Sequence, residues 1–388
     1  MLGFLLARAG IDVVVLEKHA DFFRDFRGDT IHPSTLELMH ELGLLPSFLK
    51  LPHQEARDLE FVFGSSRIRL ADFRHLPTHC RFIALMPQWD FLNFLTEQAS
   101  AYPTFNLRMA TEATDLIEEQ GRITGVRARG KAGELEIHAL LSVAADGRHS
   151  TLRERAGMRP RDLGAPMDVL WFKLDRQPDD AGQPLGSLGA GQMLVLIDRG
   201  SYWQCGYVIS KGTFEAIRAA GIAAFRRRIA EFAPSLAGHV TQLQDWNAVS
   251  LLAVQVNRLE QWWRSGLLCI GDAAHAMSPI AGVGVNLAIQ DAVATANALA
   301  NPLLDAALED EHLQRVQRRR QRPAQATQRL QLLIQNRLIS GVLKEGMTRP
   351  PLAMRLIDRL PLLRRIPGRL IGLGIRPEHI GTPDVGAR

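Results

Sequence analysis

The segment that most constrains the fold of this chain is residues 266–300, GLLCIGDAAHAMSPIAGVGVNLAIQDAVATANALA. It begins with an unbroken apolar run, residues 267–270, which is short enough to be a strand buried on both faces. Gly271 ends that strand, and Asp272 then places a carboxylate at its carboxyl end. A strand that ends in a fixed carboxylate is suited to accepting hydrogen bonds from sugar-like hydroxyl groups.

A glycine-containing loop and a helix follow this strand. Pro279, Gly282 and Gly284 have the spacing P-x-x-G-x-G, and an alanine-rich helix is expected to begin near Val285. Glycines just before a helix let a ligand approach the backbone, and the free N–H groups there favour an anion or an electron-rich edge. The segment therefore predicts a ligand-binding turn between a buried strand and a helix.

The start of the chain has the pattern of a helix followed by a second buried strand. Residues 2–9 have helical composition and end at Gly10, and the β-branched run 11–16 ends at Glu17. An acidic residue at this place is the ribose ligand of a dinucleotide-binding βαβ unit, about 20 residues beyond the G-x-G-x-x-G fingerprint. Counting back from Glu17 runs past Met1, so the first strand and its glycines are not in the sequence.

A third strand-to-turn segment lies in the middle of the chain. Residues 140–144 form a buried strand pattern, and ADGRHSTLRERAG follows. Asp146 and Gly147 end the strand, and Ser150 is placed to cap a helix.

At these residues the chain closely resembles the FAD-dependent monooxygenases of the para-hydroxybenzoate hydroxylase type, the group A flavoprotein hydroxylases. The GD motif of that family is matched by Gly271, Asp272, Ala273, Ala274, His275, Pro279, Gly282, Gly284, Asn286 and Asp291. The resemblance implies that Asp272 holds the ribityl chain of FAD. It also implies that Pro279 and the stretch from Gly282 through Val285 to Asn286 lie against the flavin ring.

The resemblance implies further cofactor contacts. Glu17 would bind the adenosine ribose, while Asp146 and Gly147 belong to a DG motif near the pyrophosphate and the reduced nicotinamide cofactor. Arg27 is preferred over its neighbour Arg24 as a pyrophosphate ligand, although a surface arginine explains it equally well. Gln88 matches a polar residue that contacts FAD at the start of a helix.

The fold class expected from these patterns is α/β. It comprises a Rossmann-like FAD-binding domain, a second domain built on an antiparallel sheet, and a helical C-terminal region. The FAD-binding domain is assigned to residues 1–58, 86–160 and 262–300, and is discontinuous and incomplete at its N-terminus. Residues 59–85 and 161–261 form the substrate domain, in which 246–256 is expected to be a strand. Residues 301–388 form the C-terminal region, helical to about residue 343 and irregular from residue 350.

The implied function is a monooxygenase reaction driven by NAD(P)H. Reduced FAD and O₂ would form a flavin hydroperoxide that transfers one oxygen to a small aromatic or cyclic substrate. The sequence identifies no catalytic base. The alternatives are a flavin-dependent reductase on the same scaffold, or a truncated, non-catalytic remnant that does not retain FAD; a halogenase is disfavoured because its W-x-W-x-I-P motif is missing.

The absent first strand leads to an expectation about the start of the chain. Met1 would be an internal methionine of the first helix, and the upstream DNA would encode the missing strand and glycines. Without them the 388-residue chain is expected to be poorly soluble or to purify without flavin.

Composition limits the remaining possibilities. The three cysteines are scattered, without a disulfide framework or metal-ligand spacing, which favours a reducing cytoplasm and predicts no metal site. His275 is accordingly interpreted as structural. Residues 311–388 contain 16 Lys and Arg against 5 Asp and Glu. A solvated helical face explains this basic segment, and the alternative is contact with anionic lipid or an acidic partner. No nucleic-acid-binding motif accompanies the charge.

Overall fold

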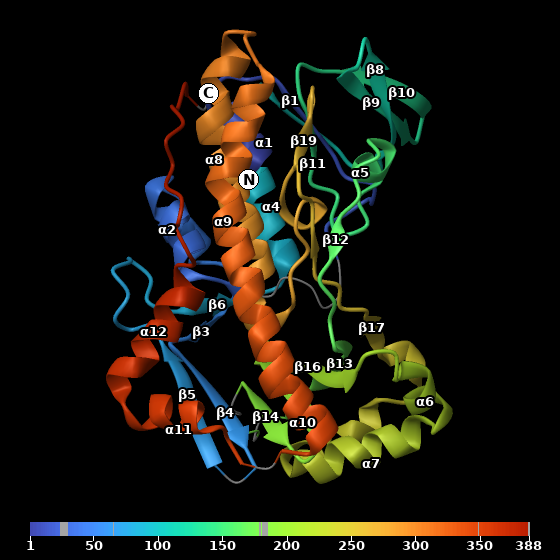
Figure 1. Cartoon of the computed structure of the whole chain (residues 1–388), viewed down its shortest axis with the longest axis vertical. Coiled ribbons are helices and arrows are strands. Elements are labelled where there is room, and N and C mark those ends of the chain that lie inside the picture. Colours follow the sequence, from blue (N-terminus) through green and yellow to red (C-terminus); the bar gives the residue numbers. More distant parts are fainter. Residues whose placement is uncertain (24–29, 65, 178–179, 181–184, 348, 387–388) are drawn as a thin grey trace.

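The computed structural model describes residues 1–23, 30–64, 66–177, 180, 185–347 and 349–386. Figure 1 shows a mixed α/β molecule in which long helices run past two separate regions of strands. The α/β class, the antiparallel sheet of the second region and the helical C-terminal region are all confirmed.

Short parallel strands form the first α/β region. Strand β1 pairs in parallel with β7, and β11 pairs in parallel with β20, which pairs antiparallel with β19. Helices α1, α4 and α8 pack together beside them. The bounds are α1 Leu2–Arg8, β1 Val13–Leu16, α2 Pro33–Glu41, α3 Leu45–Phe48, α4 Gln88–Ala99, β7 Phe105–Arg108, β11 Ser142–Ala144, α5 Thr151–Arg155, β19 Trp263–Arg264, β20 Leu267–Cys269 and α8 Val283–Leu304.

Three small antiparallel sheets border this region. The largest of them is formed by residues 112–138, with turns at 119–121 and 130–133. Gly121 and Gly133 have positive φ angles at these turns, which suits glycine. The strands are β8 Glu112–Glu119, β9 Arg122–Gly130 and β10 Gly133–His138; β2 Thr30–Ile31, β3 Gln54–Ala56 and β6 Ile83–Leu85; and β12 Arg161–Asp162 with β18 Asn257–Arg258.

A mixed, mainly antiparallel seven-stranded sheet forms the second region, in the order β17-β13-β16-β15-β14-β4-β5. Its strands come from residues 58–72 and 167–252. The expected strand 246–256 is wrong over most of its length, because only β17 pairs and Trp246–Ala248 is a 3-10 turn capped by the Asp245 carboxylate. The elements are β4 Asp58–Phe63, β5 Ser66–Asp72, β13 Met167–Asp175, β14 Gly186–Gly189, β15 Gln192–Asp198, β16 Tyr202–Ser210, α6 Phe214–Ala219, α7 Ile222–Phe232 and β17 Ser250–Leu252.

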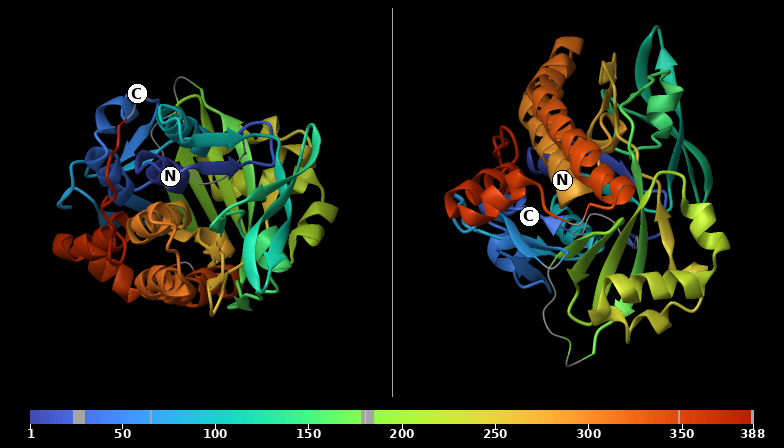
Figure 2. Two further views of the ribbon diagram at one scale, coloured as in Figure 1. Left: turned by 90° about the horizontal axis from the view of Figure 1, so that it is seen from above. Right: turned by 60° about the horizontal axis from the view of Figure 1, so that its bottom comes forward.

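The C-terminal region is helical to residue 345, close to the expected end, and two further helices follow after residue 350. Helix α9, Asp310–Ile334, runs through a π-helical turn, Gln335–Ile339, into α10, Ser340–Glu345. The irregular tail expected from residue 350 is wrong over its first half, where α11, Leu352–Arg359, and α12, Pro361–Gly372, form. Residues 350–388 contain six prolines, which is why an irregular tail is expected there, yet Pro351 is the N-cap of α11 and Pro361 is the first residue of α12. Figure 2 shows α8 and α9 side by side in orange, with the red helices α11 and α12 against blue strands.

Helix α8 connects two hydrophobic cores. Its residues Ile289 and Val293 pack into the core formed with α1, α2 and α4, while Ala292 and Leu299 pack into the core formed with β20 and α9. A helix that is apolar on most of its surface is expected to be buried on several sides. Within the described ranges, no helix is long and apolar enough to cross a membrane.

Candidate functional site

The two predicted Asp-Gly and Gly-Asp segments lie side by side. Because β11 and β20 are parallel, their carboxyl ends meet at one edge, and the Ile270 N–H donates to the Ala144 carbonyl at 3.0 Å. Asp146 and Asp272 therefore follow neighbouring strands. The Asp272 side chain is 30% exposed, and its Oδ2 lies 3.5 Å from Nη2 of Arg148. This carboxylate remains accessible to a ligand while a cation lies beside it.

The Arg153 side chain donates hydrogen bonds to both segments. Its guanidinium is buried and donates through Nη1 to the Ala273 carbonyl at 2.9 Å, and through Nη2 to the Arg148 carbonyl at 2.8 Å. Ser150 caps the short helix that carries Arg153, since its Oγ accepts from the Arg153 N–H at 3.1 Å. The backbone around Asp272 and Arg148 is thus held by one charged side chain.

The glycine loop has a left-handed backbone, and a side chain would not fit at Gly282. Ala281 and Gly282 have φ angles of 60° and 61°. A Cβ atom added to Gly282 would lie 2.2 Å from Oγ1 of Thr30, which itself donates to the Gly282 carbonyl at 3.0 Å. Gly284, by contrast, would place a Cβ atom no nearer than 3.9 Å to Met277.

The position of the helix differs from the expectation. Helix α8 begins at Val283, so Gly284, Val285 and Asn286 lie in its first turn and not in the loop. Gly284 remains sterically open in this turn. The first N–H groups of a helix lack intrahelical acceptors, so a ligand near Gly282 and Gly284 would meet hydrogen-bond donors.

Asn286 is buried and bonded entirely within the protein. Its Oδ1 accepts from the His32 N–H and from Oγ1 of Thr35, both at 2.8 Å, and its Nδ2 donates to the Thr30 carbonyl at 2.9 Å. This side chain ties the start of α8 to residues 30–35. The Asn286 side chain therefore holds the loop in place.

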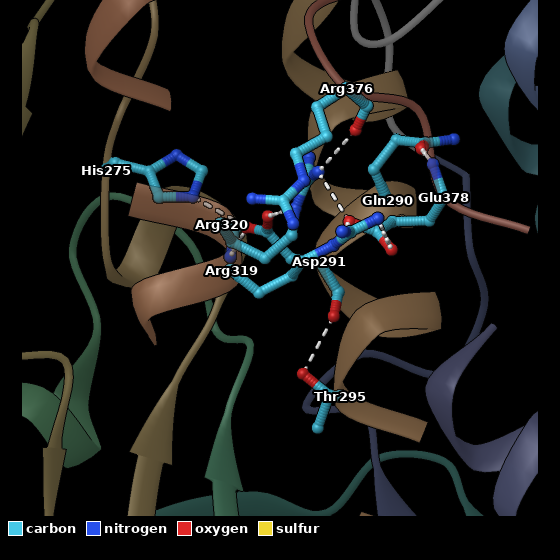
Figure 3. Close-up of polar contacts among 9 residues, drawn as sticks. His275, Gln290, Asp291, Thr295, Arg319, Arg320, Arg376 and Glu378 are labelled. Atoms are coloured by element: carbon cyan, nitrogen blue, oxygen red, sulfur yellow. Dashed lines mark hydrogen bonds and ion pairs between the residues drawn. The ribbon is translucent and has the colours of Figure 1, made fainter. Parts of the chain in front are cut away.

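A buried network of ionisable side chains lies behind the motif (Figure 3). Asp291 of α8 accepts from the Gly271 N–H at 3.1 Å and from Nε of Arg320 at 2.9 Å, and its Oδ2 lies 2.6 Å from Nε2 of His275. Arg320 of α9 also bonds Glu378 at 3.0 Å. The network fixes the backbone immediately before Asp272.

The charge of Asp291 is stabilised by its partners. Burial alone would raise the pKa of this carboxyl, but the adjacent His275 and the Arg320 guanidinium outweigh burial and hold the pKa below its ordinary value of 3.8. Asp291 is therefore an ionised, paired group inside the protein. The interpretation of His275 as structural agrees with this pairing and with its burial against Trp262.

The other predicted residues are more dispersed. Glu17 follows β1, is half-buried, and accepts through Oε1 from the His19 N–H at 2.9 Å. Gln88 is the first residue of α4 and is also half-buried. Gly147 has a φ angle of 86°, and Asp146 accepts from the Leu152 N–H at 3.2 Å. Arg27 and its alternative Arg24 lie outside the described residues.

A cavity of about 470 Å³ lies away from Asp272. It is lined by the end of β7 and the β9–β10 turn, including Arg108, Thr111 and Lys131. The Thr111 N–H donates to the Glu17 carbonyl at 2.9 Å, so this cavity borders the end of β1. It adjoins the part of the site that was predicted to hold ribose, and not the glycine loop.

Sequence reasoning missed Arg320 and Glu378. Arg320 lies in the run RRRQR, which resembles a solvated face, but it is 1% exposed. Its spacing from the buried Leu313 and Val316 places it on the apolar face of α9, and that periodicity was the available signal. No comparable local signal marks Glu378, because it lies in an extended segment.

Comparison with known proteins agrees with this geometry. A family model described as an FAD binding domain matches residues 1–330. The chain is 32% identical over 372 residues to 6-methylpretetramide 4-monooxygenase of Streptomyces rimosus, covering 95% of this chain and 88% of that protein.

Two solved structures resemble the fold. The anhydrotetracycline hydroxylase OxyS of Streptomyces rimosus matches with a TM-score of 0.76 and 22% identity, over 97% of this chain and 74% of that one. A probable FAD-dependent monooxygenase of Pseudomonas aeruginosa, pqsL, matches with a TM-score of 0.73 and 22% identity, over 88% and 93% of the two chains.

Proposed function

Since this chain belongs to the FAD-binding domain family and is an FAD-dependent oxidoreductase of the monooxygenase type, we propose that reduced nicotinamide drives its reaction. One oxygen atom of O₂ is inserted into a small aromatic or cyclic substrate. The observation that carries this proposal is the pairing of β11 with β20, which brings the segments of Asp146 and Asp272 to one edge, where the Gly271–Ala273 turn contacts α8. The similar 6-methylpretetramide 4-monooxygenase supports an aromatic, polycyclic substrate class.

The residues present have the chemistry that FAD requires. The partly exposed Asp272 offers acceptors for ribityl hydroxyl groups, and Glu17 offers them for the ribose. Gly284 leaves the place of a side chain open, since an added Cβ atom would lie no nearer than 3.9 Å to Met277, and the first N–H groups of α8 are hydrogen-bond donors. Both features suit the close approach of a flat, electron-rich ring. When bound, FAD supplies the redox chemistry that links the nicotinamide electrons to O₂.

The protein's own contribution is positioning and exclusion of water. Ile280, next to the glycine loop, packs against a buried apolar cluster that includes Val254 and, from the seven-stranded sheet, Val169 and Val208. An apolar wall beside the loop favours a hydrophobic substrate and a dry reaction site. Arg148 lies near Asp272 and offsets negative charge at this edge.

Oxygen and nicotinamide consumption test the proposal directly. Purified protein reconstituted with FAD should oxidise NADH or NADPH and consume O₂, faster in the presence of a polycyclic phenol. Isotopically labelled O₂ should place one labelled oxygen atom in the product. A saturated product formed without O₂ uptake would instead identify a reductase. Failure to retain FAD after reconstitution would identify a non-catalytic protein.

A further inference from the structure

Two exposed amphipathic helices, α11 and α12, form a surface that the proposed reaction does not use. Six large apolar side chains on these helices and their junction are exposed: Leu352, Leu356, Leu360, Leu362, Ile366 and Leu370. Leu352 is 77% exposed and Leu362 is 66% exposed. Single exposed leucines are ordinary on a protein surface, but a contiguous set indicates an interaction site.

The spacing of these residues makes one stripe on each helix. Leu352, Leu356 and Leu360 are four residues apart, as are Leu362, Ile366 and Leu370. Residues four apart lie on one helix face. Each stripe is bordered by exposed arginines at the preceding positions, namely Arg355, Arg359, Arg365 and Arg369. We call this set of leucines, isoleucine and arginines the Leu–Arg face.

The opposite faces of the two helices are already occupied. Met354 is buried in a cluster with Phe63 and Ile68 of the β4–β5 hairpin. Asp358 accepts from the Arg69 N–H of β5 at 3.0 Å, which anchors α11. Gly368 lies so close to β5 that an added Cβ atom would be 2.2 Å from the Asp72 carbonyl oxygen. The helices are thus docked on the hairpin (Figure 1), while the side chains of the Leu–Arg face are exposed.

Charge identifies the kind of partner. Helices α11 and α12 contain five arginines and one acidic residue, and that residue, Asp358, also lies 3.6 Å from Arg364. A second copy of the same face would bring arginines against arginines, which is unfavourable. A membrane surface that contains anionic lipid offers apolar chains for the leucines and phosphate groups for the arginines.

We propose that the Leu–Arg face attaches this protein to the surface of a membrane containing anionic lipid. The leucines enter the boundary between headgroups and acyl chains, and the arginines contact the headgroup phosphates. This attachment is independent of the proposed reaction, so either can fail without the other.

Vesicle flotation of the full chain tests the proposal. The protein should float with vesicles of phosphatidylcholine mixed with phosphatidylglycerol, and much less with phosphatidylcholine alone. Added salt should reduce the binding, because the arginine contribution is screened. A protein that floats with neither vesicle, or equally with both, overturns the proposal.

Matched variants separate the Leu–Arg face from general charge. Reversing Arg365 and Arg369 to Glu should lower partitioning into the mixed vesicles more than about tenfold, since each arginine near an anionic surface contributes about fivefold. The same reversal of Arg227 and Arg228, which are exposed on α7, should have a smaller effect. Equal losses in the two variants would contradict a specific face.

Two further measurements test the apolar part. A Leu362→Trp variant should show a shift of emission to shorter wavelength on adding mixed vesicles, whereas Leu140→Trp, at another exposed leucine, should not. Light scattering during size-exclusion chromatography tests whether a second copy of the chain covers the Leu–Arg face instead. A dimer that disappears when Leu352, Leu356, Leu362 and Ile366 are changed to Ser would assign the face to a second copy and overturn the membrane proposal.

Discussion

At the scale of single residues, Asp272 is the side chain on which cofactor retention should depend most. It lies partly exposed at the end of β20, and a hydrogen bond to a charged partner contributes about 1.5–3 kcal/mol. Asp272→Ala should therefore lower FAD affinity at least about tenfold. Glu17→Gln should lower it less, because one acceptor oxygen survives. Flavin absorbance after desalting measures both, with the exposed Glu119→Ala as control, and an Asp272→Ala protein that keeps its full flavin would exclude this role.

His32 gives the protein a defined acid sensitivity. It is buried, and Nδ1 lies 2.8 Å from the Ile371 carbonyl oxygen of α12. Burial lowers its pKa from 6.5 to about 4, against a smaller opposing effect of the Ile371 and Ala281 carbonyls. The folded state therefore holds His32 neutral where the unfolded state binds a proton. The contribution of neutral His32 to the free energy of unfolding is fully present above pH 6.5 and is lost as the pH falls toward 4.

The expected loss across that range is roughly 3 kcal/mol. His32→Asn keeps a donor for the Ile371 carbonyl but cannot titrate, so it should flatten the dependence of unfolding free energy on pH. Asp291 titrates below this range because its pKa is lowered, and it should not mask the effect. Denaturant unfolding at several pH values measures how the unfolding free energy depends on pH. The exposed His138→Asn variant should retain the wild-type slope.

At the scale of elements, the junction between the glycine loop and α8 depends on Gly282. Its φ angle of 61° and the Thr30 hydroxyl 2.2 Å from an added Cβ atom both oppose a side chain. Gly282→Ala should cost about 1–3 kcal/mol of stability. Gly284→Ala, two residues further in the first turn of α8, should cost little. Thermal unfolding of the two variants provides the comparison, and equal stability would show that the loop adapts.

The contact between α8 and α9 depends on Arg320. If it is removed, the Asp291 carboxylate keeps, among the described residues, His275 and the Gly271 N–H, and removing one partner of a buried ion pair costs about 3–5 kcal/mol. Arg320→Met should be destabilising by this order, while the exposed Arg318→Met should be nearly neutral. Combining Arg320→Met with Asp291→Asn should recover part of the loss in a double-mutant cycle. Additive losses would show that the two groups are not coupled.

At the scale of the whole molecule, the C-terminal strap, residues 376–386, connects the N-terminal and C-terminal elements (Figure 1). The Val385 N–H donates to the Arg8 carbonyl at 3.0 Å, and the Asp384 carboxylate lies 3.2 Å from Arg8 Nε. The Ile380 N–H donates to Glu41 at 2.7 Å, and Glu378 bonds Arg319 and Arg320. The strap therefore contacts α1, α2 and α9 together.

A chain that stops after Arg376 should lose several kcal/mol of stability, at about 1 kcal/mol for each typical hydrogen bond and more for the charged ones. Its thermal midpoint should fall well below that of a chain that stops after Gly386, which keeps the strap. The Asp291 network loses Glu378 in the first chain only. Unchanged stability would show that the strap lies on the protein without supporting it.

The sequence by itself determined the local parts of the site. The apolar run before Asp272, the glycines before α8 and the Asp146–Gly147 turn after β11 are encoded within a few residues each. Strand burial, helix starts and positive φ angles are local preferences, so they could be predicted without knowing any partner. The short helices α11 and α12 were missed because prolines at helix starts resemble breaks.

Only the tertiary structure decided which distant residues share an environment. Arg320 belongs to a basic run, yet the contact of α9 with α8 places it against Asp291, 29 residues away, while Glu378 reaches it from the strap. Burial and pKa depend on every element packed around a group, and no short window of sequence contains that information. The same reason explains why the leucines of α11 and α12 are exposed: β5 covers the opposite faces of these helices and leaves the Leu–Arg face outside.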